Sequence, residues 1–152
     1  MPICRTKYHG AMEYAEGAVL HFPLGLFGFE EETRFLSIEQ PALRPIVFLQ
    51  SLATPDLCFL ALPVSVVDPD YSADLQPEDL KKIQLPAHRQ PEIGSDILCL
   101  ALLVIQENGP TTANLLAPIV VNRQNLLAIQ AISRNQDYSH QVPVHSEEYA
   151  CS

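Results

Sequence analysis

The protein has 152 residues, of which 47% are hydrophobic, 18% charged and 7% aromatic. Nine Lys and Arg residues against 18 Asp and Glu residues give a formal net charge of −9, and the acidic excess is present in both halves of the chain. A surface of this charge repels phosphate, which argues against direct binding of nucleic acid or of an anionic membrane and favours a basic partner. The high apolar content and low charge density exclude disorder for most of the chain.

The length predicts one domain, which we place at residues 1–140, followed by a flexible tail at 141–152. Residues 1–5 lack the apolar region and cleavage site of a signal peptide. The longest apolar run, residues 97–105, has nine residues, whereas a membrane helix needs about 20. We therefore expect a cytoplasmic protein without a membrane segment, and a monomer.

Motifs for catalysis or metal binding are absent from the sequence. Cys58 and Cys99 lie inside apolar runs and are predicted to be small buried side chains, while Cys4 and Cys151 have no CxxC partner. The five histidines show no ligand spacing, and no GxSxG motif, P-loop or dinucleotide fingerprint occurs. The sequence predicts no metal, no cofactor and no enzymatic activity.

Strand patterns dominate from one end of the chain to the other. Residues 23–28 form a Gly-rich loop, 77–83 predict one short helix with Pro at its first turn, and the apolar run within 96–106 indicates a strand buried on both faces. This pattern predicts an all-β fold, a small closed or near-closed antiparallel β-barrel of eight or nine strands. The predicted strands are residues 3–8, 11–14, 18–22, 34–39, 45–52, 57–67, 96–106, 113–121 and 126–132.

An acidic loop after residue 67 is the first candidate partner site. It carries Asp68, Asp70 and Asp74, together with Tyr71, which we expect to be exposed. The spacing of the carboxylates departs from that of a Ca²⁺ loop, and no glycine occupies the turn position. Two interpretations stay open: a solvated acidic face, or a recognition patch for a basic partner with Tyr71 as its aromatic anchor.

Residues 112–122 (TANLLAPIVVN) are the most distinctive segment. Pro118 within an apolar strand run predicts a sheet edge or a bulge, where another chain's backbone can add as a strand. Asn114 is expected to satisfy backbone groups at the start of that edge. The alternative is a strand with a bulge and no partner. For Gly25 and Gly28 the alternatives are likewise an irregular turn or a loop that contacts a partner.

At this segment the chain resembles the family of the flagellar assembly factor FliW. The similarity runs through residues 6–10 (TKYHG), 21–30 (HFPLGLFGFE), 49–51 (LQS), 54–56 (TPD) and 114–122 (NLLAPIVVN). The acidic loop and Tyr138 also match, so the resemblance covers about residues 3–140. The chain departs from the family at Phe27, where Pro is usual, and beyond His140.

The resemblance implies a non-enzymatic, β-barrel-like regulator of flagellum biogenesis. Such proteins bind flagellin in the cytoplasm and, when flagellin is secreted, bind the RNA-binding translational repressor CsrA without simply occupying its RNA surface. For partner binding we select Asp68, Asp70, Tyr71 and Asp74 for the basic partner, and Asn114 and Pro118 for a flagellin terminus. The competing interpretations are a small-molecule-binding barrel of lipocalin type and a structural subunit of a larger complex.

Overall fold

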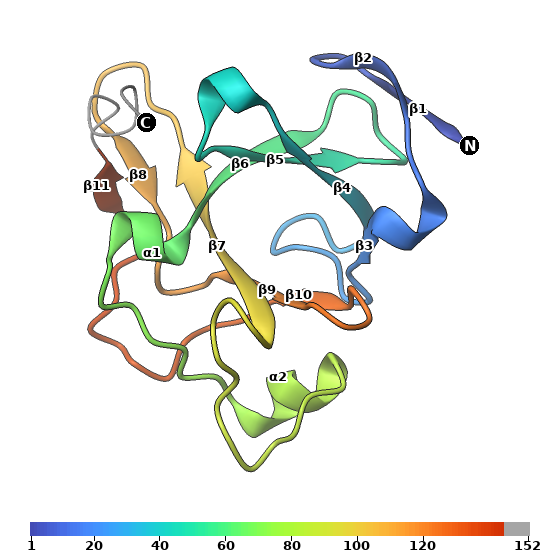
Figure 1. Ribbon diagram of the computed structural model, residues 1–152. Coiled ribbons are helices and arrows are strands. Elements are labelled where there is room, and N and C mark those ends of the chain that lie inside the picture. The colour runs from blue at the N-terminus through green and yellow to red at the C-terminus, as the bar shows by residue number, and fades with distance from the viewer. Residues whose placement is uncertain (145–152) are drawn as a thin grey trace.

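Figure 1 shows the computed structural model of the protein, which describes residues 1–144. That part of the chain contains two α-helices, α1 (Val64–Val67) and α2 (Pro77–Lys82), and two 3-10 helices, η1 (Glu16–Ala18) and η2 (Pro41–Leu43). Its strands are β1 (Ile3–Thr6), β2 (Gly10–Glu13), β3 (Val19–His21), β4 (Arg34–Glu39), β5 (Val47–Ser51), β6 (Cys58–Pro63), β7 (Ile97–Val104), β8 (Thr111–Ala113), β9 (Ile119–Asn122), β10 (Ala128–Gln130) and β11 (Val142–Val144). The all-β class is confirmed, with more strands and one more α-helix than the sequence predicted.

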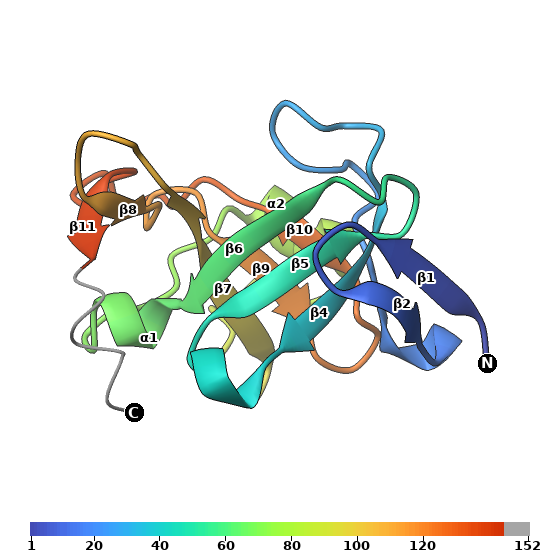
Figure 2. The same cartoon turned by 90° about the horizontal axis from the view of Figure 1, so that it is seen from above.

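Nine of the strands form one antiparallel sheet, and β1 and β2 form a separate hairpin. The main path runs β10-β9-β7-β6-β5-β4-β3, and β8 pairs with both β7 and β11. Figures 1 and 2 show the sheet curving around a common interior, so that β3 comes close to the chain just before β10. There the His21 amide donates to the Leu126 carbonyl over 3.0 Å, and one parallel bridge joins His21 to Leu127. A single bridge is not a strand ladder, so the predicted barrel closure is not confirmed.

Two apolar clusters lie on opposite sides of β7. Leu100 packs with Phe22, Phe35 and Leu49 in the interior of the curved sheet. Cys99, its neighbour in sequence, packs under α2 with Leu80 and other residues. Because successive side chains of a strand point to opposite faces, an unbroken apolar run supplies both clusters. The predicted burial on both faces of this strand is therefore confirmed up to Leu103, while Val104 and Ile105 are exposed.

Three local predictions were wrong. Residues 64–67 form the short helix α1 where a strand was expected; its β-branched residues favour a strand, but Val64 is buried in the cluster under α2. Residues 113–121 are two strands, β8 and β9, separated by a turn. Val142–Val144 pair with β8 as β11, within the segment assigned to the tail, and the rest of that tail, residues 145–152, lies outside the described part.

The Gly-rich loop between β3 and β4 is a tight turn in which Gly25 is essential. Gly25 has φ +66°, and a Cβ atom there would lie 2.5 Å from backbone atoms of Phe29 and Glu30. Its amide donates to the Phe22 carbonyl over 2.9 Å, and the Leu26 side chain that follows is almost completely buried. The interpretation of Gly25 and Gly28 as turn residues fits these positions, since both have positive φ.

We expect Gly25→Ala to lower the free energy of unfolding by about 2–4 kcal/mol, because left-handed strain and a backbone clash add together. Gly17→Ala is the matched control, since Gly17 has open space around its Cα. Urea unfolding of the two variants checks this. Equal stability of both would show that the turn tolerates a side chain at residue 25.

Candidate partner-binding surface

The acidic loop, residues 68–76, connects α1 to α2 and is folded by its own hydrogen bonds. The Asp68 amide donates to the Val64 carbonyl at the end of α1, and the Asp68 carbonyl accepts the Tyr71 amide over 3.0 Å. The Asp68 carboxylate accepts the Asp70 amide over 2.9 Å. Asp68 therefore shapes the turn, and Asp70 is left on its exposed tip. Within the described residues the Asp70 carboxylate makes no hydrogen bond or ion pair.

Tyr71 is not the exposed anchor that the sequence predicted. Its ring stacks on that of Tyr138 with 4.4 Å between centroids, and its hydroxyl donates to the Leu115 carbonyl over 3.0 Å. The Tyr138 hydroxyl in turn accepts the Ser72 amide over 3.1 Å. Burial raises the pKa of Tyr71, and the thiol of Cys99, the Tyr138 hydroxyl and the carboxylate of Asp68 add to the shift. The expectation failed because Tyr138, distant in sequence, covers the ring.

Asp74 is held by Arg134. Two guanidinium nitrogens of Arg134 lie 2.7 and 2.8 Å from one carboxylate oxygen, and the Arg134 amide donates to the Asp74 carbonyl over 2.8 Å. The side chains are 40% and 43% exposed, so the pair contributes at most about 1 kcal/mol. Its main effect is to tie the acidic loop to the chain that follows β10. Of the four residues predicted in this loop, only Asp70 offers an unpaired exposed carboxylate.

Asn114 and Pro118 lie in the turn between β8 and β9, and this turn is not an open sheet edge. The Asn114 side-chain oxygen accepts the amides of Leu116 and Ala117 over 3.1 and 2.9 Å. The Pro118 carbonyl accepts the Ala131 amide over 3.0 Å. Strand addition needs unpaired backbone groups, so these residues have structural roles and the predicted edge is corrected. The structure does bring this turn beside the acidic loop, through the hydrogen bond from Tyr71 to Leu115.

Two hollows of similar size in the described part of the chain contain none of the predicted partner-binding residues. One, of about 350 Å³, is lined by aliphatic side chains including Leu43, Leu60, Ile105 and Val144. It lies where β7 leaves β6 and pairs with β8. The other, also about 350 Å³, lies between the Gly-rich loop and α2; it includes Phe27 and is lined by apolar and polar side chains in equal number. A signal for the second hollow was present in the sequence, since large apolar residues in a Gly-rich loop are unusual for a solvated turn.

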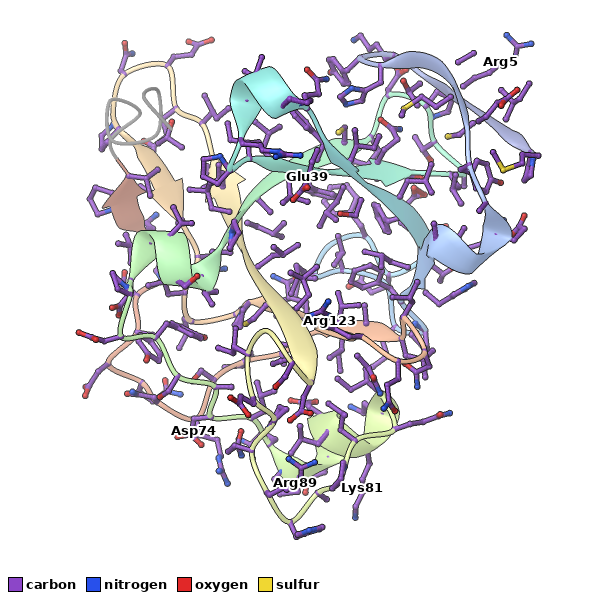
Figure 3. The ribbon with its side chains drawn as sticks, viewed as in Figure 1. Arg5, Glu39, Asp74, Lys81, Arg89 and Arg123 are labelled. Atoms are coloured by element: carbon purple, nitrogen blue, oxygen red, sulfur yellow. The ribbon has the colours of Figure 1, made fainter. Side chains whose placement is uncertain are left out.

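Charged side chains of both signs lie on α2, on the connector after it and on the acidic loop. Figure 3 shows Asp74 together with the cationic side chains of Lys81 and Arg89, which belong to α2 and the connector after it. Arg89 pairs with Asp96 over 3.3 Å, and Lys82 pairs with Asp79 over 3.7 Å. Hydrogen bonds from the Glu92 amide and from Arg89 hold the pKa of Asp96 below its usual value. Several cations here are thus engaged by carboxylates.

Within residues 1–144, no group of three or more His, Cys, Asp or Glu side chains is arranged to hold a metal ion. Cys4, Cys58 and Cys99 are free thiols. Cys99 is buried as predicted, and burial raises its pKa to about 12, whereas Cys58 is only partly buried. No helix in the described part of the chain is long and apolar enough to cross a membrane.

Fold and surface together define an all-β protein in which one strongly curved sheet carries loops fixed by side-chain hydrogen bonds. Comparison with known proteins identifies the family. The model of the family described as FliW protein matches residues 3–144, and the chain belongs to this family. The resemblance found in the sequence is thereby confirmed.

The similar proteins span nearly the whole chain. The flagellar assembly factor FliW of Bacillus licheniformis is 34% identical over 146 residues, which cover 95% of this chain and 98% of that protein. The protein of the same name from Bacillus subtilis is 31% identical over 146 residues, with the same coverage. A crystal structure of the flagellar assembly factor FliW matches with a TM-score of 0.81 and 31% identity, covering 97% of this chain and 99% of that one.

We expect Tyr71→Phe to lower the free energy of unfolding at pH 7 by about 1 kcal/mol, since it removes the hydrogen bond to Leu115 and keeps the stacked ring. The raised pKa of Tyr71 adds a pH dependence. The stabilisation of the folded state by the neutral Tyr71 hydroxyl is fully present below the unfolded-state pKa of about 10. It is lost as the pH rises above that value, because the unfolded chain then releases the proton more readily than the folded chain. The difference between wild type and variant should therefore shrink above pH 10.

Urea unfolding at pH 7, 9 and 11 measures this difference. Tyr8→Phe is the control, because Tyr8 is exposed on the β1–β2 hairpin. A pH-independent gap between wild type and Tyr71→Phe would contradict the assigned burial of the hydroxyl.

Proposed function

We propose that this protein is a flagellar assembly factor that binds flagellin in the cytoplasm and, when free of flagellin, binds and antagonises the translational regulator CsrA. Relief of repression then allows translation of flagellin mRNA. Membership of the FliW family carries the proposal. The two Bacillus relatives are named flagellar assembly factor FliW, and this chain matches each of them over nearly its full length. The protein acts by binding, as a monomer, and not as an enzyme.

The charge of the chain supports CsrA as one partner. An RNA-binding protein presents basic groups, and this chain has a net charge of −9 with an exposed carboxylate at Asp70. Complementary charge speeds association and selects against wrong partners more than it adds affinity. Asp68 contributes by holding Asp70 at the tip of the loop, and Asp74 by anchoring the loop to Arg134.

The same charge offers a route to antagonism without occupying the RNA surface. A bound acidic protein places carboxylates beside the regulator and repels the phosphates of an approaching RNA. At physiological ionic strength this repulsion extends over only about 8 Å, so the acidic face must lie at the border of the RNA site. Neutralising the acidic loop without loss of the antagonism would rule this route out.

The test is titration calorimetry with CsrA from the same organism, with and without flagellin. We expect the protein to bind each partner, and flagellin to prevent CsrA binding. Heat with flagellin alone would reduce the function to that of a flagellin chaperone. No heat with either partner would overturn the proposal.

Charge reversal tests the role of the acidic loop. Asp70→Lys should weaken CsrA binding about three- to tenfold, mainly through slower association, and should leave flagellin binding unchanged. Glu39→Lys is the matched control, because Glu39 is an exposed carboxylate on β4 that lies well away from Asp74 in Figure 3. Surface plasmon resonance at two salt concentrations separates the rates. Equal effects of both variants would show that only total charge matters.

A further inference from the structure

The loop that joins β7 to β8 carries the only Asn-Gly step of the sequence, Asn108–Gly109. The loop spans residues 105–110, all of which are exposed, and Figure 1 shows it beyond the ends of the two strands. The outermost pair of β7 with β8 joins Val104 to Thr112, and in the described part of the chain the loop itself belongs to no ladder. The Asn-Gly step therefore lies in an exposed segment outside the hydrogen-bonded framework of the sheet.

An Asn side chain followed by Gly carries two groups that can react with each other. The backbone nitrogen of Gly109 can attack the side-chain carbonyl carbon of Asn108, Cγ, and close a five-membered succinimide ring. The new bond joins this nitrogen to Cγ, the bond from Cγ to Nδ2 breaks, and ammonia leaves with the proton that the Gly109 amide gives up. Gly hinders this attack least, because it has no side chain beside the nitrogen.

Both reacting groups are free within residues 1–144. The Asn108 side chain makes no hydrogen bond there, and the Gly109 amide donates none. A carboxamide that is held in place, or an amide that donates a hydrogen bond, must first be released before a ring can close, and each release costs free energy. The ring at Asn108 can close without that cost.

The fold holds the other four asparagines of the chain in place. In each of them the side-chain oxygen accepts the backbone amide two residues further along; they are Asn114, Asn122, Asn125 and Asn135. After the first three, the next amide, which would be the nucleophile, also donates a hydrogen bond, over 3.0, 3.2 and 2.8 Å. None of the four is followed by Gly. Sequence and structure thus both distinguish Asn108 from the rest.

We propose that Asn108 is a site of spontaneous covalent modification, at which the folded protein converts Asn108 through a succinimide with Gly109 to aspartate and isoaspartate. Water is the only co-reactant. Its addition to the Cγ carbonyl of the ring gives aspartate, whereas its addition to the main-chain carbonyl gives isoaspartate, in which the backbone runs through Cβ and Cγ. Either product adds one negative charge at neutral pH.

The modification changes one surface of the molecule. Ile105 and Thr111, at the two ends of the loop, line the hollow that aliphatic side chains including Leu43 and Val144 also line. Deamidation places a carboxylate in the loop between them, and isoaspartate lengthens the backbone of the loop by one atom. Neither change touches the pairing of β7 with β8, so the modified chain should keep its fold while it differs in charge beside this hollow.

Incubation of the folded full chain at pH 6, 7 and 9, then digestion at acidic pH and peptide mapping by mass spectrometry, measures the reaction at each asparagine. Conversion adds the mass difference between a hydroxyl and an amino group, and incubation in water enriched in heavy oxygen marks the product formed before digestion. We expect conversion at Asn108 to exceed that at each other asparagine by about tenfold or more, because hydrogen bonds must break first at those sites. It should accelerate as the pH rises, because the Gly109 nitrogen attacks after losing its proton.

Gly109→Ala keeps Asn108 and tests the nucleophile. A Cβ atom at residue 109 would lie 3.2 Å from Oε1 of Gln106, the far end of a flexible side chain, so the fold should tolerate it. The added methyl group crowds the attacking nitrogen and should slow conversion about tenfold. Gly17→Ala is the matched control, since it adds the same group in open space and should convert at the wild-type rate. Thermal unfolding verifies that both variants keep the fold.

A comparison with the chain unfolded in urea completes the test. Similar rates at Asn108 in the folded and the unfolded chain, with faster conversion of the other asparagines in urea, would support the proposal. A rate at Asn108 that rises strongly in urea would show that the folded loop prevents ring closure, and would overturn it. Conversion at Asn108 no faster than at Asn135, or equal rates in wild type and Gly109→Ala, would overturn it as well.

Discussion

Burial of β7 on both faces is the constraint on which the rest of the structure depends. This strand pairs with β9 through residues 97–100, with β6 through residues 100–102 and with β8 through residues 103–104. Its alternate side chains supply the sheet interior on one face and the cluster under α2 on the other. A one-residue shift of its register would move every side chain to the opposite face, so each cluster would receive side chains of a different size and shape from those it packs. The curvature of the sheet and the position of α2 therefore follow from β7.

The short strand β10 connects the two apolar clusters to the Gly-rich loop at the surface. Its three residues have three destinations: Ala128 packs in the sheet interior, Ile129 packs under α2, and Gln130 bonds the backbone of Phe27. The Gly-rich loop is thus positioned by the same strand that completes both clusters. Two residues beyond β10, Ile132 borders the hollow, and Arg134 holds Asp74.

The sequence predicted well what local patterning decides. The bounds of β4 were predicted to the residue, α2 begins at the predicted proline, and the apolar run of β7 is buried on both faces. Sequence patterns gave wrong predictions where contacts between distant segments determine the local structure. Val64–Val67 has a strand-like composition yet forms a helix whose Val64 is buried under α2, and Asn114 bonds two amides to make a turn inside one apolar run.

At the candidate site, too, local patterns were informative and contacts between distant segments could not be predicted. A charge pattern identified the acidic loop, but no pattern shows that Tyr138 covers Tyr71 or that Arg134 pairs with Asp74. Most of the predicted polar residues turn out to fix loops, which leaves Asp70 as the exposed charge among them. Charge alone selects a partner by sign, whereas affinity requires apolar area removed from water. In this protein Asp70 presents an exposed charge on a loop of fixed geometry, whereas Leu24, Phe27 and Ile132 present exposed apolar area at a separate hollow.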